Sequence, residues 1–221
     1  MEENTSSSKL GTKTYWDSCY QAENDNFDSH GDVGEIWFGE ESVVRVITWL
    51  EDKMTEAGVD HDSPILEVGC GNGVLCVELV KTGFSNVTGV DYSEGAVELA
   101  RKIAAKEECD IFYQTLDILD QKQTETNYKE SFKVVIDKGT FDAISLSETS
   151  ASDKVQYVKS IHQILENDGL LLITSCNWTD SELVDTFSLC FTLFDSGNTT
   201  FVTFYGKIGS AETFCIFKKK S

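Results

Sequence analysis

The sequence lacks long apolar runs and any regular spacing of cysteines. No stretch approaches the roughly eighteen apolar residues of a membrane-spanning helix, and no signal peptide begins at Met1, so we expect a soluble protein inside the cell. The seven cysteines include no Cys-x-x-Cys pair, and their odd number argues against a disulfide framework. Reduced thiols fit a cytoplasmic or nuclear location best.

Histidine is also scarce, which narrows the chemistry. His30, His61 and His162 lie far apart and show no metal-ligand spacing, so we expect no metal site. No histidine stands at an expected strand end beside a serine or cysteine. Catalysis by a serine or cysteine nucleophile is therefore unsupported.

Basic residues are few relative to acidic ones. The chain has 18 Lys and Arg against 38 Asp and Glu, a net charge of −20. Nucleic acid is then a poor partner, because phosphate binding needs a basic face. A basic protein surface is a better partner, since complementary fields steer encounter. Plain solubility is the alternative explanation, and composition alone favours it.

The N-terminal part divides into a tail and an arm. Residues 1–13 are polar and rich in serine, so we expect a disordered tail. Residues 14–41 are acidic yet carry many aromatic side chains, which predicts an arm that packs on the remainder of a single domain, 14–221. A helical stripe covers 41–56, with Ser42 as its possible cap.

From residue 65 onward, strand and helix patterns alternate. We predict strands at 65–68, 87–90, 111–116, 132–136 and 170–174, and helices at 74–82, 94–106, 154–165 and 181–190, with Gly169 closing the third of these. A poor helix is expected within 121–130. A closing hairpin pairs 199–205 with 212–217. The pattern predicts an α/β, Rossmann-like, seven-stranded sheet, mostly parallel, with one antiparallel strand in its edge region and helices on both faces.

A glycine turn, Gly69-Cys70-Gly71-Asn72-Gly73, follows the first strand and opens a helix. Glycines allow close approach of the backbone to a ligand, and the helix N-terminus offers free N–H groups. A dinucleotide fold is the rival, but its fingerprint places the third glycine where Val74 stands. The turn resembles motif I of the S-adenosylmethionine-dependent methyltransferases.

Polar residues follow three further strands at the same edge of the expected sheet, where ligands of open α/β sheets bind. These pairs are Asp91-Tyr92, Asp117-Ile118 and Asp137-Lys138.

Each acidic residue has a binding role and a structural alternative. Asp91, 22 residues after Gly69, can accept both ribose hydroxyls, or it can cap a helix. Asp117 can accept from the adenine amino group beside Ile118, or it can be a turn aspartate. Glu67 can orient the methionine ammonium, directly or through water, or it can be a partly buried carboxylate paired with backbone N–H groups.

The segment after the fourth strand bears on the substrate. Enzymes of this fold that methylate nucleobases or planar amides usually carry Asn/Asp-Pro-Pro-aromatic there. This chain has Asp137-Lys-Gly-Thr-Phe-Asp-Ala143, and Pro64 is its only proline. Base and glutamine methylation are therefore disfavoured.

Several motifs together resemble the seven-strand protein-lysine methyltransferases that act on translation elongation factor 1-alpha, from about Thr14 to the C-terminus. These are Tyr15-Trp16-Asp17-x-x-Tyr20, the phrase 31–40 with Gly39-Glu40, Glu67-Val-Gly-Cys-Gly-Asn-Gly73, Val90-Asp91-Tyr92-Ser93, Asp137-Lys-Gly-Thr-Phe-Asp-Ala143 and Ser175-Cys-Asn-Trp178. The chain departs from the family in lacking prolines within 194–203, a segment that often shapes the substrate surface.

The resemblance implies S-adenosyl-L-methionine as donor, S-adenosylhomocysteine as product and elongation factor 1-alpha as the basic protein substrate. It implies that the arm folds over the cofactor with Trp16, Tyr20 and Trp37 near it, and that Lys138 lies at the methionine end. Aromatic residues that merely attach the arm to the core are the alternative. We further expect a monomer that binds neither nucleic acid nor membrane.

Transfer to lysine needs a neutral amine and an acidic rim to hold the arriving ammonium. Asp137, Asp142 and Glu35 are candidates for this rim. Asp137 and Lys138 are the only catalytic candidates, and the sequence assigns no general base. A small-molecule methyltransferase, disfavoured by the missing substrate-cap insertion, and a non-catalytic S-adenosylmethionine-binding protein are the alternatives.

Overall fold

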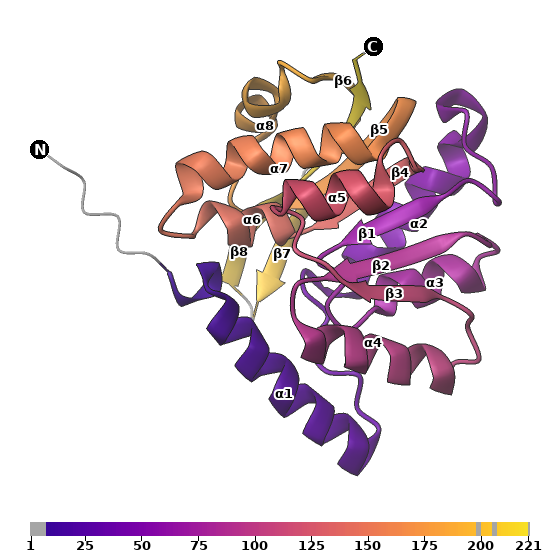
Figure 1. The fold of residues 1–221 in the computed structure, drawn as a ribbon, viewed down its shortest axis with the longest axis vertical. Coiled ribbons are helices and arrows are strands. Elements are labelled where there is room, and N and C mark those ends of the chain that lie inside the picture. The colour runs from indigo at the N-terminus through magenta and orange to yellow at the C-terminus, as the bar shows by residue number, and fades with distance from the viewer. Residues whose placement is uncertain (1–7, 198–199, 205–206, 221) are drawn as a thin grey trace, which may run out of the picture.

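A mixed β-sheet with helices on both faces forms the body of the protein in this computed structural model (Figure 1), which describes residues 8–197, 200–204 and 207–220. Within those ranges, seven strands follow the order β3-β2-β1-β4-β5-β8-β6, and β7 pairs with β8 alone. The strands are β1 (Ile65–Val68), β2 (Val87–Asp91), β3 (Phe112–Thr115), β4 (Phe132–Lys138), β5 (Leu165–Ser175), β6 (Phe191–Ser196), β7 (Thr200–Phe204) and β8 (Lys207–Lys219).

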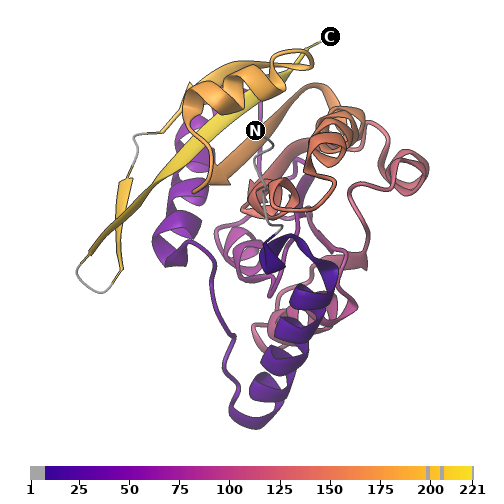
Figure 2. The same cartoon turned by 90° about the vertical axis from the view of Figure 1, so that its left-hand side faces the viewer.

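Strands β1 to β5 pair in parallel, whereas β8 runs antiparallel to both β5 and β6. The predicted α/β class, with one antiparallel strand in the edge region, is confirmed. β7 and the first half of β8 extend beyond the body of the sheet (Figure 2). The outer strand β6 was not predicted, because its exposed Thr192 and Leu193 leave no alternating apolar pattern.

Helices cover both faces of this sheet. They are η1 (Lys9–Gly11), α1 (Lys13–His30), α2 (Gly39–Ala57), α3 (Val74–Lys81), α4 (Glu94–Lys106), α5 (Gln121–Tyr128), α6 (Thr140–Ser145), α7 (Ser150–Ile164) and α8 (Asp180–Phe187). Side chains of α2, α3 and α4 form one apolar cluster with the sheet, and those of α5 to α8 form the other. None of the helices described is both long and apolar enough to cross a bilayer.

The aromatic arm is mostly helix α1, which packs along α4 (Figure 1). Asn24 is its one buried residue, and its side-chain amide donates to the carbonyl of Gly95 at 2.8 Å. α1 ends at Gly31, whose φ of 70° gives the left-handed conformation common after helices. Of the tail expected to be disordered, residues 1–7 lie outside the described residues, and residues 8–13 form η1 and the first residue of α1.

Two helix boundaries differ from the sequence expectation. The helix expected at 154–165 ends at Ile164, and β5 begins at the next residue, so Gly169 lies within the strand rather than closing the helix. α2 begins at Gly39 after Phe38, whose φ is 63°. Ser42 is consequently buried within the first turn and does not cap the helix.

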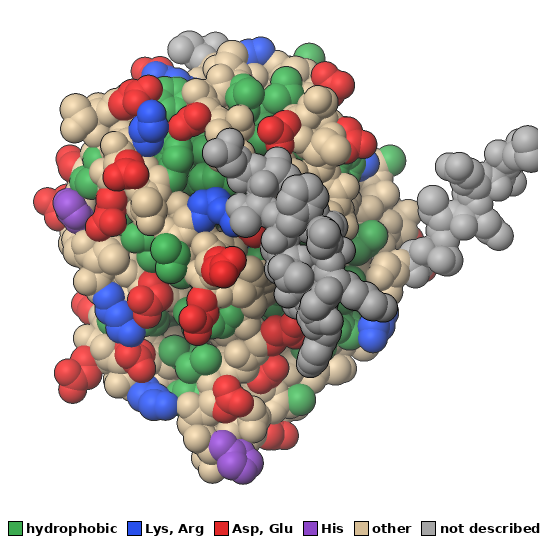
Figure 3. All heavy atoms as spheres, turned by 180° about the vertical axis from the view of Figure 1, so that it is seen from behind, with side chains coloured by type: hydrophobic (Ala, Val, Ile, Leu, Met, Phe, Trp, Pro, Cys, Tyr) green, Lys and Arg blue, Asp and Glu red, His purple; other side chains and the backbone are tan. Residues whose placement is uncertain are grey.

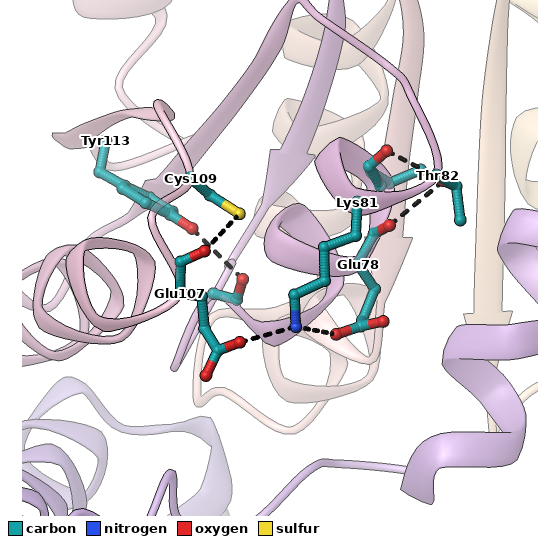
Figure 4. Close-up of polar contacts among 8 residues, drawn as sticks. Glu78, Lys81, Thr82, Glu107, Cys109 and Tyr113 are labelled. Carbon is teal, nitrogen blue, oxygen red and sulfur yellow. Dashed lines mark hydrogen bonds and ion pairs between the residues drawn. The ribbon is translucent and has the colours of Figure 1, made fainter.

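The end of α3 is tied to the end of α4 on the surface. Lys81 lies between Glu78, at 3.0 Å, and Glu107, at 2.8 Å (Figure 4). Such exposed ion pairs contribute little to stability, because water and salt screen them. Nearby, the Tyr113 hydroxyl donates to the Gly73 carbonyl at 3.2 Å, which links β3 to the glycine turn.

Candidate active site

The glycine turn between β1 and α3 adopts a conformation that glycine favours. Gly69 has φ 62° and Gly71 has φ 55°. A Cβ on Gly69 would lie 1.9 Å from the Thr140 hydroxyl, and one on Gly71 would lie 2.6 Å from the Tyr20 hydroxyl. Larger residues would therefore push apart the turn, α6 and α1, which all meet here.

Asp91, the last residue of β2, holds two neighbouring backbone segments. Its carboxylate accepts from the Gly71 N–H at 3.0 Å and from the Ser93 N–H at 2.9 Å. Burial raises its pKa to about 6, although these N–H groups oppose the shift. Ser93 itself is the N-cap residue of α4, so Asp91 is not the cap.

A cavity of about 400 Å³ opens at the carboxyl ends of the strands, a size within the usual range for small-molecule sites. It brings together most of the residues proposed from the sequence, namely Trp16, Tyr20, Trp37, Gly69, Cys70, Gly71, Asn72, Asp91, Tyr92, Asp117, Ile118 and Lys138. Glu67, Gly73 and Asp137 are not on its wall.

Glu67 is only 2% exposed and accepts from the Cys76 thiol at 3.0 Å. Burial raises its pKa to about 7, while the Lys138 charge and the Cys76 contact oppose the shift. Glu67 thus matches the buried-carboxylate alternative in its location, with a thiol as its hydrogen-bond donor.

The alternation of side chains along β4 separates Asp137 from Lys138. Asp137 is fully buried on the α7 side, where it accepts from the N–H groups of Thr140 and Phe141 at 2.8 and 3.0 Å and from the Tyr157 hydroxyl at 2.5 Å. Burial raises its pKa to about 7. Placing Asp137 on the acidic rim is therefore wrong, because its carboxylate anchors the start of α6.

Lys138 points the other way, into the cavity. Its ammonium donates to the Trp37 carbonyl at 3.1 Å. Burial lowers its pKa, and the charges of Glu67 and Asp137 counteract that effect. Among the described residues that line the cavity, Lys138 is the one basic side chain.

The arm covers this cavity. Trp16 stacks on Tyr20 with ring centroids 6.2 Å apart and meets Trp37 edge-on at 5.0 Å. The Trp16 indole N–H donates to the Leu10 carbonyl at 2.7 Å. From the core, the Asn72 amide donates to the carbonyls of two linker residues, Val33 at 3.0 Å and Glu35 at 3.2 Å.

One wall was missed by sequence reasoning. It comes from α6 and the segment leading to α7, with contributions from the N-terminal segment and the end of β5. Its residues are Leu10, Gly11, Ala143, Ile144, Leu146, Ser147, Thr149, Asp153, Cys176 and Asn177. α6 has only six residues, fewer than two helical turns, so its apolar side chains form no repeating pattern that predicts a helix. Asp142, proposed for the rim, does line the cavity, and so does Glu35.

A methyltransferase-domain family model matches residues 60–206, which include the glycine turn and every strand from β1 to β7. EEF1A lysine methyltransferase 2 of Mus musculus is 44% identical over 96% of this chain and 85% of its own length. The chain belongs to the EEF1A lysine methyltransferase 2 family. The human protein of that name is 43% identical over 96% of this chain and 87% of its own length.

More distant relatives agree with membership of this family. The protein-lysine N-methyltransferase efm4 of Schizosaccharomyces pombe is 39% identical over 82% of this chain and 81% of its own length. Magnesium protoporphyrin IX methyltransferase from Synechocystis, solved with bound S-adenosylmethionine, superposes with a TM-score of 0.65 at 16% identity, covering 91% of this chain and 97% of its own. That likeness extends to the fold alone.

Proposed function

We propose that this protein is an S-adenosylmethionine-dependent protein-lysine N-methyltransferase that acts on elongation factor 1-alpha. The single observation that carries the proposal is the cavity shared by the glycine turn, Asp91 and Lys138 beneath the aromatic arm. Relatives over 40% identical along most of the chain are named for that substrate. Their names support the choice of substrate.

The cavity suits each part of the donor. Asp91 keeps unused carboxylate lone pairs toward the cavity for the ribose hydroxyls. Ile118 offers an apolar surface to the adenine ring, and Asp117 offers an acceptor to its amino group. Lys138 supplies the positive charge that a methionine carboxylate needs. S-adenosylmethionine supplies an already activated methyl group, so alignment and exclusion of water are the main tasks of the chain.

The surface charge favours a basic protein as the acceptor. Acidic side chains are spread over the face seen in Figure 3, and basic ones are fewer there. With a net charge of −20, the protein attracts a basic partner over several ångströms. We further propose that it works as a monomer in the cytoplasm or the nucleus.

Labelled S-adenosylmethionine, incubated with the protein and with purified elongation factor 1-alpha, tests the proposal. We expect label on the factor and none on a factor whose lysine amines have been blocked by acetylation. Label that appears only in the small-molecule fraction of a lysate would instead identify a small-molecule methyltransferase. Donor binding with no transfer to any acceptor would identify a non-catalytic binding protein.

A further inference from the structure

The order of the strands divides the cavity into two sides, and this inference rests on the proposed function. The ends of β1, β2 and β3 supply the glycine turn, Asp91 and Ile118, the residues proposed to hold the donor. The ends of β4 and β5 lie on the other side of β1. They supply Lys138, proposed above for the donor's methionine carboxylate, and beyond it Cys176 and the residues of α6 that follow β4. An acceptor therefore has to approach the methyl group from the β4–β5 side.

Asp142 is a carboxylate held rigidly on that side. Its Oδ1 accepts from the Ser175 hydroxyl at 2.5 Å, and its Oδ2 accepts from the Cys176 N–H at 2.8 Å. The residue is 5% exposed and lines the cavity. Burial raises its pKa. The Ser175 hydroxyl, the Cys176 N–H and the Cys176 thiol fix both carboxylate oxygens of Asp142 at the wall of the cavity.

The other carboxylates near this side are less suited to an amine. Asp137 faces α7 and lies outside the cavity. Asp153 accepts from the hydroxyls of Ser147 and Thr149, both at 2.7 Å, at the start of α7. Glu35 is exposed on the linker between α1 and α2, so neither packing nor a strand end fixes it.

We propose that Asp142 is the residue that binds the amine of the substrate lysine and orients it toward the methyl group. The lysine ammonium ion-pairs with the carboxylate on arrival and then releases one proton to water. The neutral amine remains hydrogen-bonded to Asp142, which fixes the direction of its lone pair. That lone pair forms the new N–C bond and displaces a neutral thioether, which leaves with the electrons of the broken S–C bond. The nitrogen ends as a methylated ammonium.

Ser175 serves as a positioning residue in this proposal. Its hydroxyl fixes Oδ1 of Asp142 and also accepts from the N–H groups of Asn177 and Trp178, both at 3.1 Å. Removing the hydroxyl frees the carboxylate to rotate without removing its charge. The Ser175→Ala variant should therefore lower the rate of transfer less than loss of the charge does.

The deciding experiment compares Asp142→Asn with the wild-type protein. Calorimetry measures S-adenosylhomocysteine binding, and labelled donor measures transfer to purified elongation factor 1-alpha. We expect unchanged affinity for S-adenosylhomocysteine and a fall in kcat/KM of about ten- to a hundredfold, as loss of a charge-assisted hydrogen bond implies. Asp142→Glu should restore part of the activity.

Asp120→Asn is the matched control, because Asp120 also accepts backbone N–H bonds but lies outside the cavity, at the start of α5.

Near wild-type kcat/KM in Asp142→Asn would overturn the inference and leave the proposed function standing. Loss of S-adenosylhomocysteine affinity in parallel with activity would also overturn it, since Asp142 would then serve the donor site or the fold. If Asp142→Asn unfolds, Ser175→Ala decides, with full activity as the contrary result. No transfer by the wild-type protein would overturn both proposals.

Discussion

Asp91 combines two tasks in one carboxylate, since it closes the glycine turn through Gly71 and faces the cavity with its remaining lone pairs. Substitutions at this residue therefore differ in their consequences according to which oxygen they keep. Asparagine can accept from only one of the N–H groups of Gly71 and Ser93, which bond different oxygens, whereas alanine leaves both unpaired. The two variants should therefore differ in how much stability they lose, while both lose the negative charge that faces the cavity.

Asp91→Asn should weaken S-adenosylhomocysteine binding by about ten- to a hundredfold, because a hydrogen bond to a charged group contributes about 1.5–3 kcal/mol. Isothermal calorimetry measures the affinity. Asp91→Ala should in addition lower the free energy of unfolding by about 1–3 kcal/mol, since buried N–H groups lose their acceptor. An equal affinity in wild-type and Asp91→Asn proteins would remove Asp91 from the ribose role. Asp110→Asn, an exposed change, is the control.

Asp137 makes stability depend on pH. Its pKa rises from 3.8 to about 7 on folding because burial disfavours the charged form. The folded state therefore holds the proton more tightly, so this stabilising contribution is present below about pH 4 and is lost as the pH rises through about 7. A shift of this size corresponds to roughly 4 kcal/mol.

Urea unfolding at several pH values between 4 and 8 tests this dependence. The free energy of unfolding should fall more steeply with rising pH in the wild-type protein than in Asp137→Asn, which cannot ionise there. Comparing the two slopes isolates Asp137 from Glu67 and Asp91, whose raised pKa values act in the same direction. Parallel slopes would contradict the prediction.

At the scale of elements, helix α1 covers the cavity and contributes few side chains to the hydrophobic core. Its single buried residue is Asn24, while Trp16 and Tyr20 line the cavity. The arm is attached to α4 by contacts outside the site, such as Lys102 with Asp28 at 2.9 Å, and to the site by the bond from Lys138 to the Trp37 carbonyl. Changes in the part of α1 that lines the cavity should therefore alter ligand binding more than global stability.

Trp16→Ala should weaken S-adenosylhomocysteine binding by at least about fivefold, because it removes three aromatic contacts and the bond to Leu10. The midpoint of thermal unfolding should change little. Calorimetry and circular dichroism measure the two effects, with the exposed Gln21→Ala on the same helix as the control. A large loss of stability with unchanged affinity would show that Trp16 serves only to attach the arm.

The sequence was sufficient for elements with a strong pattern. The apolar run 65–68 and the amphipathic stretch 94–106 match β1 and α4 residue for residue. Strand β6 and helix α6 escaped prediction, one because an exposed edge strand needs no apolar alternation and the other because it is shorter than two turns. Closer reading of the sequence would not reveal these two elements, because contacts with the rest of the fold determine both.

For the site, the expectation that ligands bind where the strands of an open α/β sheet end located Asp91, Ile118 and Lys138 correctly at the cavity. The same expectation failed for Asp137, because it locates the end of a strand but not the face of the sheet on which a side chain lies. Glu67 precedes the turn within β1 and is buried with Cys76, so it does not line the cavity. Their roles toward a cofactor remain predictions.

At the scale of the whole molecule, the charge of −20 governs encounter with a charged partner. Attraction between exposed charges is screened over about 10 Å at 0.1 M salt and over shorter distances above that. A basic substrate protein should therefore meet this enzyme faster at low ionic strength. A small uncharged acceptor would show no such dependence.

Raising sodium chloride from 0.05 to 0.3 M, on the order of a halving of the screening length, should lower kcat/KM for elongation factor 1-alpha by about tenfold. The loss should fall on KM, because the buried reaction site is little screened. S-adenosylhomocysteine affinity, measured by calorimetry in the same buffers, is the internal control. A flat salt dependence of kcat/KM would argue against electrostatic steering of the substrate.

Successive side chains along β4 point to opposite faces of the sheet, and this alternation decides which of them reaches the site. Lys138 faces the cavity and Asp137 faces α7 only because the strand begins where it does. Deleting one residue between Phe132 and Asp137 would move Lys138 to the place of Asp137 beside Tyr157, and would leave Gly139 at the cavity in place of the lysine. The single basic side chain on the described wall of the cavity thus depends on the length of the strand that precedes it, so an insertion or deletion within β4 would remove the positive charge from the cavity.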